Sequence, residues 1–471
     1  MFFRIINIAY RLLVSTIYMM QQIFSLDSSF VMICLLAIFI CFFSLGYYLS
    51  TNGNGWATQS DKRPIVNDPH LKVEKVFEGL KLPTSMTFLG PNDILVLEKD
   101  NGTVRRIVNG HLLKEPLLDV NVANKSERGM LGIATSKNED TNVTYVFLYY
   151  TEAKTKDGDD VSEGNEPLGN RLYRYELEDN QLINPKLLLN LPATPNRHNG
   201  GPLLIGPDKN VYLLIGDIGQ ETKTQNFEKG PDSNGTGVIY RLSQDGKPVG
   251  SILSDKPSAN KFFAYGIRNS FGMDFDPVSG NLWNTENGLN YGDEINLVEP
   301  GFNSGWSKVQ GMWGSTSHFT DYKSKKRAGY AEDITLGPPK GLVDFDGKGK
   351  YRSPEFTWNH SVGPTAVKFL DSKKLGHSYD KDLFVGDFLN GNLYHFNLNE
   401  NRTGLILPDP LSDRIANSSE EFKALVFARG FGGNQVFSHF DVSGITDIET
   451  GLDGYLYILT FRGEIYRIVP K

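Results

Sequence analysis

The chain has 471 residues, more than one ordinary hydrophobic core organises, and this length predicts either several domains or a closed repeat architecture. Its 48 Gly, its 23 Pro and its 12% content of aromatic residues favour many short strands joined by tight turns. A formal charge of −7, with no long block of Lys and Arg, argues against a nucleic-acid partner.

The amino-terminal part differs in composition from the rest. Residues 30–49 are apolar and uncharged, and about 20 residues at about 1.5 Å each span the hydrocarbon of a bilayer. We therefore expect a transmembrane anchor at 30–49. A cleaved signal peptide and a buried core helix are the alternatives. Residues 1–29 are also apolar but contain Arg4 and Arg11, so they lie along the membrane interface or form a second, weaker span.

The number of spans decides the topology. With one span, Arg4 and Arg11 hold the amino terminus inside and the rest of the chain is exported, whereas two spans leave it in the cytoplasm. Cys34 and Cys41 both lie within the predicted span and do not distinguish the two cases. We expect a membrane-anchored protein whose domain faces the extracellular or periplasmic side, joined to its anchor by a polar linker at 50–68.

Residues 69–471 repeat one pattern, a β-prone run, a turn and a second short strand that ends near an aromatic residue or an arginine. Six imperfect copies begin at 93–98, 143–150, 211–217, 280–286, 382–387 and 454–459. The period of about 65 residues is longer than that of usual propeller blades and leaves room for long loops. We predict an all-β fold, a six-bladed β-propeller, with five or seven blades as alternatives. Ring closure would gather its loops around a central channel.

Two segments carry functional groups that a blade does not require. His198 lies in a glycine-rich polar segment before the predicted strand 211–215, where backbone can approach a ligand closely. A single histidine of this kind is more often structural than catalytic. Arg268 and Asn269 interrupt an apolar run and need partners if they are buried.

A third segment, 285–296, is dense in glycine and in oxygen donors, which include Glu286 and Asp293. Carboxylates and backbone carbonyls are the ligands of Ca²⁺ sites, so the segment is a candidate metal site. Turns favour the same residue types for conformational reasons, and an ordinary turn is the alternative.

Together and in this order, the segments 198–217, 265–272 and 286–306 resemble the glucose/sorbosone dehydrogenase family. The similarity extends over about 73–469. It implies a six-bladed propeller that binds pyrroloquinoline quinone (PQQ) and oxidises aldoses.

The resemblance also implies roles for individual residues. His198 matches the general base that takes the proton of the anomeric hydroxyl while hydride passes to PQQ. Arg268 matches a residue that binds the cofactor and stabilises charge on the quinone oxygen, with Asn269 and Asn287 as further cofactor-binding residues.

The same resemblance places a Ca²⁺ that polarises the quinone on the backbone carbonyls of Gly288 and Leu289. Glu286 and Asp293 complete the set of predicted metal-binding residues. Leu289 stands where the family has proline; it still offers a carbonyl but lacks the rigidity of proline.

Three positions depart from the family pattern. Leu389, Gly444 and Thr446 stand where cofactor-binding Lys and Arg residues are expected. PQQ carries three carboxylates, and each lost cationic partner costs about 1.5 to 3 kcal/mol. Arg429 and the basic residues 323–327 are candidates to replace them.

The leading hypothesis is a membrane-anchored, PQQ- and Ca²⁺-dependent dehydrogenase that acts on a small sugar and passes electrons to an unidentified acceptor. The alternative is an inactive propeller that binds an extracellular glycan or protein, which the three departures favour. A Ca²⁺-dependent propeller hydrolase, such as a lactonase, is a third.

Overall fold

The computed structural model describes residues 63–154, 167–314, 339, 341–432 and 444–471. The predicted segments 1–29 and 30–49 and most of the linker 50–68 lie outside the described residues. The longest helix of the described part, α3 (Ser419–Phe422), has four residues, and no helix there is long and apolar enough to cross a membrane. Because a helical span needs about 20 residues, the expectation of a membrane-anchored protein with an exported domain is corrected on this finding.

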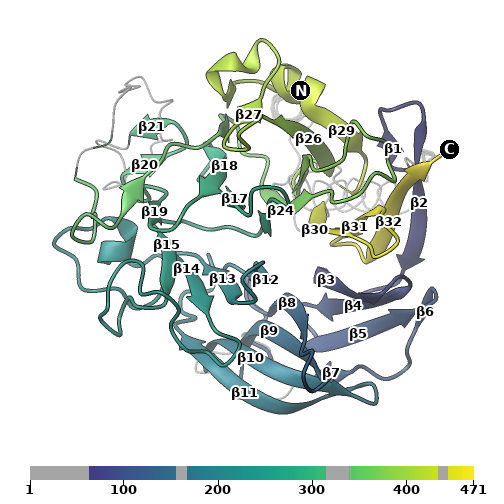
Figure 1. Ribbon diagram of the computed structural model, residues 1–471, viewed down its shortest axis with the longest axis horizontal. Coiled ribbons are helices and arrows are strands. Elements are labelled where there is room, and N and C mark those ends of the chain that lie inside the picture. Colours follow the sequence, from purple (N-terminus) through teal and green to yellow (C-terminus); the bar gives the residue numbers. More distant parts are fainter. Residues whose placement is uncertain (1–62, 155–166, 315–338, 340, 433–443) are drawn as a thin grey trace, which may run out of the picture. The chain divides into compact units, whose positions relative to one another are not determined.

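The described residues fold into an all-β propeller, with sheets arranged around a centre (Figure 1). Among the described residues, six sheets have four or more strands. From the inner strand outward, the first three contain β3 (Pro83–Gly90), β4 (Asp93–Glu98), β5 (Thr103–Val108) and β6 (His111–Leu112); β8 (Met130–Lys137), β9 (Thr144–Glu152), β10 (Gly169–Glu178) and β11 (Gln181–Leu191); and β12 (Leu203–Ile205), β13 (Val211–Ile215), β14 (Val238–Leu242) and β15 (Phe262–Tyr265).

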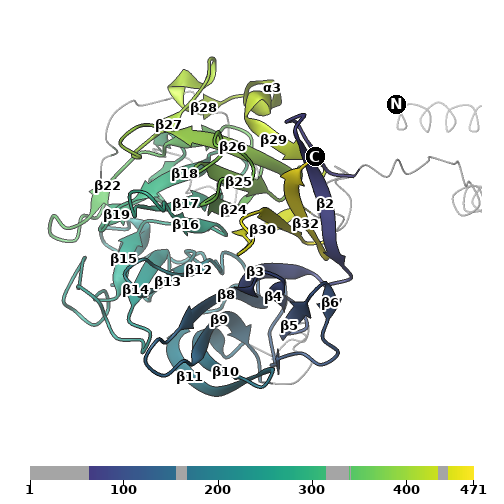
Figure 2. The same ribbon diagram turned by 45° about the vertical axis from the view of Figure 1, so that its right-hand side comes forward.

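The other three sheets continue around the centre in the order of the sequence, and their strands are again given from the inner strand outward (Figure 2). They contain β16 (Met273–Phe275), β17 (Leu282–Glu286), β18 (Asp293–Val298) and β23 (Phe356–Trp358); β24 (Pro364–Phe369), β25 (Leu383–Asp387), β26 (Asn392–Leu398) and β29 (Val426–Arg429); and β30 (Ile445–Thr450), β31 (Leu456–Thr460), β32 (Glu464–Pro470) and β2 (Leu71–Glu78).

Shorter elements decorate this framework. The remaining strands of the described part are β1 (Ile65–Val66), β7 (Leu118–Asp119), β19 (Phe302–Asn303), β20 (Val309–Gln310), β21 (Trp313–Gly314), β22 (Lys350–Tyr351), β27 (Leu405–Ile406) and β28 (Ile415–Ala416), and three 3₁₀ turns lie at Lys223–Gln225, Leu411–Asp413 and Lys423–Leu425. β1 falls within the predicted linker 50–68 and pairs with β29.

Neighbouring inner strands pack against one another around the centre: β3 on β8, β8 on β12, β12 on β16, β16 on β24, β24 on β30 and β30 on β3. The ring is closed by β2, from the start of the described chain, which pairs antiparallel with β32 at its end. Their register runs from Leu71 opposite Pro470 to Glu78 opposite Glu464. One sheet thus contains strands from both ends of the propeller.

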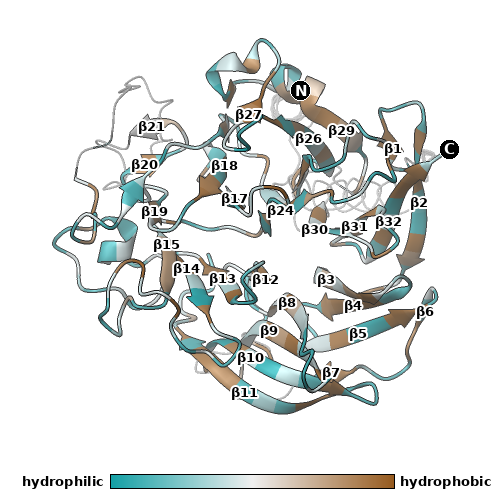
Figure 3. Cartoon of the chain, viewed as in Figure 1, coloured by the Kyte–Doolittle hydropathy of each residue, from teal (hydrophilic) through white to brown (hydrophobic). Residues whose placement is uncertain are grey.

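Each predicted repeat forms the second and third strands of a sheet. The second strands of several sheets, such as β13, β17 and β25, are buried throughout, because neighbouring sheets cover both of their faces. Third strands such as β5 and β26 contain both buried and partly exposed residues. Apolar residues are concentrated on the strands, shown in brown in Figure 3. Between two sheets, for example, Phe147 and Tyr149 of β9 join Leu213 and Ile215 of β13 in one buried cluster.

Candidate active site

Three loops carry the residues singled out by sequence. His198 lies between β11 and β12, Arg268 lies between β15 and β16, and Gly288 lies between β17 and β18. Loops that enter an inner strand and loops that join a second strand to a third emerge at the same end of antiparallel sheets. The loops meet there, because the Asp217 amide donates to the Arg268 carbonyl at 2.8 Å and Arg268 Nη1 donates to the Gly288 carbonyl at 2.8 Å.

His198 is paired with a carboxylate. Its Nδ1 lies 2.5 Å from Asp217 Oδ1, and the two side chains are 13% and 5% exposed. Asp217 directly follows Gly216 at the end of β13, where a Cβ on Gly216 would lie 2.5 Å from the His198 carbonyl oxygen. When Asp217 accepts a hydrogen bond from Nδ1–H, the lone pair of the imidazole is on Nε2.

Glu127, in the loop before β8, links two of these loops. Its Oε2 accepts hydrogen bonds from the His198 backbone amide at 2.6 Å and from Asn269 Nδ2 at 3.0 Å. A single carboxylate oxygen therefore fixes both the backbone of His198 and the side chain of Asn269.

Arg268 is 8% exposed and is held by backbone carbonyls. Nη1 donates to Asn287 O at 2.7 Å as well as to Gly288 O, and the guanidinium carbon lies 5.4 Å from the centroid of the Trp306 ring. Burial lowers the pKa of Arg268 from its ordinary value, and the charge of Asp217 opposes this shift.

Three buried polar atoms near this point have no hydrogen-bond partner among the described residues: Arg268 Nε, Asn269 Oδ1 and Asn287 Oδ1. Most buried polar groups in proteins are paired, so an unpaired set of this kind marks a place where a ligand would supply the partners. Asn287 Nδ2, by contrast, donates to the Pro364 carbonyl at 3.0 Å, which fixes the side chain.

Asp293 fastens two loops to each other. It accepts hydrogen bonds from the amides of Gly288 at 2.7 Å, Val362 at 2.7 Å and Gly363 at 2.8 Å, and from the Ser361 hydroxyl. The pKa of Asp293 is nevertheless raised, because burial penalises its charged form. Its oxygens are thus occupied by protein donors.

Glu286 is bonded in a similar way. Oε1 accepts from the Arg268 amide at 2.7 Å and Oε2 accepts from the Ser304 hydroxyl at 2.6 Å. Burial raises the pKa of Glu286 above its ordinary value, and the hydrogen bond from the Arg268 amide opposes this shift.

Three of the four predicted calcium ligands accept hydrogen bonds from the protein. The Gly288 carbonyl is bonded to a guanidinium, and the carboxylates of Glu286 and Asp293 are bonded to protein donors. Leu289 follows Gly288 in the same loop. Throughout the described ranges, no group of three or more His, Cys, Asp or Glu side chains could hold a metal ion.

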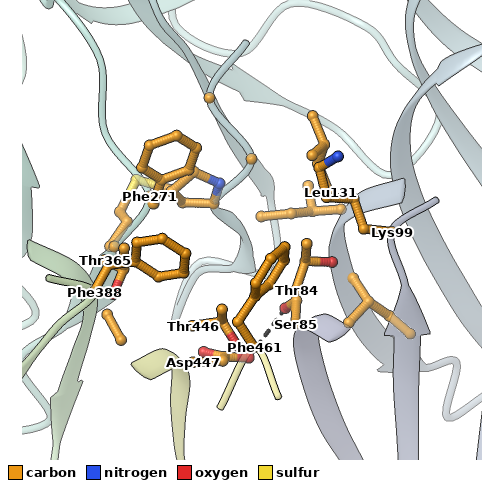
Figure 4. Close-up of a pocket in the computed structure, with 18 of the residues that line it drawn as sticks. Thr84, Ser85, Lys99, Leu131, Phe271, Thr365, Phe388, Thr446, Asp447 and Phe461 are labelled. Carbon is orange, nitrogen blue, oxygen red and sulfur yellow. Dashed lines mark hydrogen bonds between the residues drawn. The ribbon is translucent and has the colours of Figure 1, made fainter. Parts of the chain in front are cut away.

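A cavity of about 670 Å³ lies along the inner strands and reaches Glu127, Gly200 and Gly201, next to the His198 loop. Figure 4 shows aromatic side chains on its wall. Phe388 and Phe461 pack edge to face with ring centroids 5.4 Å apart, and Phe271 also faces the cavity.

The charged groups that line this cavity are mainly acidic. They are Asp100, Glu127, Asp447 and Glu449 on the acidic side and Lys99 and Lys368 on the basic side. Lys99 Nζ donates to Asp100 at 2.7 Å, and Lys368 Nζ lies 2.8 Å from Glu449. Each of these ammonium groups is therefore already paired with a carboxylate.

The three positions that depart from the family pattern lie at the same end of the propeller as His198. Leu389 is in the β25–β26 loop, Gly444 precedes β30 and Thr446 is on β30. A Cβ on Gly444 would lie 2.2 Å from the Phe388 carbonyl oxygen, so the Phe388 backbone occupies the space that a larger residue at 444 would need. Arg429 is exposed on β29 and is not among the residues that line the cavity. Residues 323–327 lie outside the described residues.

Sequence reasoning did not single out Glu127, Asp217 or Trp306 as functional residues. Asp217 stands at the end of the same predicted strand that His198 precedes, and the hairpin geometry is a signal that could have paired them. Glu127 and Trp306 reach the site from distant loops, and only the fold brings them there.

Comparisons with known proteins extend over most of the chain, which includes the segments singled out above. A family model described as Glucose / Sorbosone dehydrogenase matches residues 80–467. Aldose sugar dehydrogenase YliI of Escherichia coli is 25% identical over 85% of this chain and 93% of its own length. Quinoprotein glucose dehydrogenase B of Acinetobacter calcoaceticus is 30% identical over 50% of this chain and 52% of its own length.

Among solved structures, the PQQ-bound aldose sugar dehydrogenase of Streptomyces coelicolor has a TM-score of 0.58 at 20% identity, covering 87% of this chain and all of that one. At this identity the likeness shows a shared fold. The match of the family model over most of the chain goes further, and it shows that the chain belongs to the glucose/sorbosone dehydrogenase family.

Proposed function

We propose that this chain is an oxidoreductase that oxidises a hydroxyl group of an aldose or related sugar. The observation that carries the proposal is the His198–Asp217 pair, 2.5 Å apart, beside Arg268 and Asn269 in loops that meet at one end of the propeller. Family membership and the names of the two relatives reported above, both sugar dehydrogenases, support it.

His198 is the proposed base. Its Nε2 accepts the proton of the sugar hydroxyl, while Asp217 at Nδ1 fixes the orientation of the ring and stabilises the imidazolium that forms. A positioned general base contributes about 10²- to 10⁴-fold to a rate. The Glu127 hydrogen bond to the His198 amide holds the loop that presents the ring.

Arg268, Asn269 and Asn287 are the residues that would hold a quinone cofactor. Their unpaired buried atoms include a donor on Arg268 and two acceptors on the amides, and this set fits the carbonyls and the ring N–H of a planar quinone such as PQQ. When bound, the quinone supplies the acceptor of the hydride that leaves the sugar carbon, and an external acceptor then takes the electrons.

A second candidate function is a propeller that binds a glycan or protein without turnover. It is favoured by Leu389, Gly444 and Thr446, whose side chains carry no positive charge for the carboxylates of PQQ, and by the paired state of both described cavity lysines. A Ca²⁺ ion held by the carbonyls of Gly288 and Leu289, near Glu286 and Asp293, stays a prediction, because an oxygen that accepts one hydrogen bond keeps a further lone pair. We also propose that the propeller has six blades, one for each sheet of four or more strands.

The test is a titration of the full chain with PQQ, in parallel with and without Ca²⁺, followed by steady-state reduction of an artificial electron acceptor by a panel of aldoses. We expect saturable PQQ binding, and sugar-dependent turnover in the arm that contains Ca²⁺. Saturable binding of sugars in the absence of any PQQ uptake would favour the binding propeller. Equal turnover in the two arms would contradict the predicted Ca²⁺ site.

A further inference from the structure

Trp306 contacts both halves of the proposed machinery. It lies between β19 and β20 and is 7% exposed. Its indole Nε1–H donates to Asp217 Oδ2 at 2.6 Å, and the face of its ring lies under the Arg268 guanidinium at 5.4 Å. No other described side chain donates to Asp217 Oδ2 in a hydrogen bond of this structure.

The backbone of Trp306 is fixed as well. Its amide donates to the Gly266 carbonyl at 2.9 Å, and its own carbonyl accepts from Asn226 Nδ2 at 2.7 Å. The backbone of Trp306 is therefore anchored to the loop that carries Arg268 and to the turn at Asn226. Since both neighbours are buried backbone or amide groups, the ring has little freedom to move away from Asp217.

The two oxygens of Asp217 have different partners. Oδ1 faces His198 Nδ1 at 2.5 Å and the Gly219 amide at 2.9 Å, whereas Oδ2 faces the indole. A donor on Oδ2 fixes the rotation of the carboxylate and withdraws part of its negative charge from the imidazole. Both effects act on His198 through Asp217 and require no contact between Trp306 and a substrate.

We infer that Trp306 is a positioning residue of the base, which orients the Asp217 carboxylate through its N–H and the Arg268 guanidinium through its ring. The inference rests on the proposed function for its catalytic consequence, although its structural part concerns the protein without any cofactor. Through these two contacts, Trp306 fixes the position of Arg268 relative to the His198–Asp217 pair.

Other charged groups also lie next to the His198–Asp217 pair. Glu127 contacts the His198 amide, and Arg268 lies over the indole with Glu286 bonded to its own amide. Trp306→Phe leaves all of these in place and keeps an aromatic face under Arg268. The variant therefore isolates the loss of the indole N–H.

The experiment is a titration of His198 by ¹⁵N NMR in the cofactor-free full chain, in the wild type and in Trp306→Phe, with His198→Asn to assign the signal. Loss of the N–H leaves more negative charge on Asp217, which favours the imidazolium. We therefore expect the His198 signals of the variant to keep the imidazolium form to a higher pH than those of the wild type. Trp358→Phe is the control, because its buried indole nitrogen has no described hydrogen-bond partner; it should leave the His198 titration unchanged.

A second readout uses the loaded enzyme. In Trp306→Phe, the acidic limb of the kcat/KM profile should move to higher pH by the same amount, with KM for the sugar at high pH changed less than twofold. If Trp306→Phe does not fold, the wild type provides a substitute measurement. Its Trp306 indole ¹⁵N–H signal, assigned with Phe variants of the other tryptophans, should shift as His198 titrates.

An unchanged His198 titration in a folded Trp306→Phe variant, or an indole signal that ignores that titration, would overturn the inference. A wild type without turnover would instead count against the proposed function, and the NMR result on the cofactor-free chain would still decide the role of Trp306.

Discussion

At the scale of single residues, the site is a chain of short polar contacts that runs from Glu127 through His198 and Asp217 to Trp306. Each member reaches the site from a different loop, except His198 and Asp217, which flank one hairpin. The function proposed for His198 depends on Asp217, since this carboxylate fixes the tautomer of the imidazole and stabilises the imidazolium.

Asp217→Asn tests this dependence. The amide keeps the shape of the carboxylate but removes the negative charge at 2.5 Å from Nδ1, so we expect kcat to fall by about 10²-fold or more. The thermal midpoint should fall as well, because the NH₂ group of the amide faces a donor where the carboxylate accepted one. The control is Asp232→Asn, at an exposed aspartate paired with Lys223, which should leave kcat unchanged. Equal kcat values in the wild type and Asp217→Asn would remove Asp217 from the mechanism.

At the scale of elements, the ends of strands position these residues. At the ends of β13 and β25, the structure requires a particular type of residue. A Cβ on Gly216, at the end of β13, would lie 2.5 Å from His198 O and 2.7 Å from Arg268 O. Asp387, at the end of β25, is fully buried and accepts hydrogen bonds from the amides of Asn390 and Gly391 and from the Tyr394 hydroxyl.

Gly216→Ala should destabilise the protein by about 1 to 3 kcal/mol, because two backbone carbonyls must shift to admit one methyl group. Gly90→Ala is the matched control, since its Cβ would meet only Asp93 Cβ at an ordinary 3.4 Å. Chemical unfolding of both variants measures the difference. Equal midpoints for the two would mean that the His198 loop tolerates displacement.

Asp387 gives a dependence of stability on pH. Burial raises its pKa from 3.8 to about 6, so the folded state binds more protons than the unfolded state between these values. The contribution of this group is fully favourable below about pH 4 and is lost as the pH rises through about 6, a change of about 3 kcal/mol at 1.36 kcal/mol per unit. Asp387→Asn, in which the Tyr394 hydroxyl can accept from the amide, should flatten the unfolding free energy over pH 4 to 7. The same slope in wild type and variant would assign the effect to another group.

At the scale of the whole molecule, the site exists because the ring is closed. β2 and β32 are separated by most of the sequence and share one sheet, so the loops at one end of the propeller are held together from both ends of the described chain. Leu71, on β2 and 3% exposed, packs into a buried cluster with Ile468.

Leu71→Ala should therefore lower the stability of the entire propeller by about 2 to 5 kcal/mol, while Lys72→Ala on the exposed face of the same strand stays within about 0.5 kcal/mol. Far-UV circular dichroism and the fluorescence of the buried tryptophans, which include Trp283 and Trp358 in another sheet, should shift together. A shift in only one of the two signals would show that the sheets unfold independently.

Much of this architecture follows from local sequence. The six predicted repeats form the second and third strands of six sheets, because those strands are long and apolar. The inner strands β12 and β16 have three residues each, too few for a periodic signal, and the pairing of β2 with β32 depends on contacts across the chain. The same difference holds at the site. His198 and Arg268 stand in recognisable motifs and Trp306 ends one, but the roles of Glu127 and Trp306 follow only from loops that the fold brings together.

The measurement that tests the central claim most directly is a single-turnover one. Protein loaded with PQQ is mixed with an aldose and the reduction of the cofactor is followed by absorbance, in the wild type and in His198→Ala. The account predicts rapid reduction in the wild type and a rate at least about 10²-fold lower in His198→Ala, with equal amounts of cofactor bound. Reduction at the same rate in both proteins would contradict the assignment of His198 as the base.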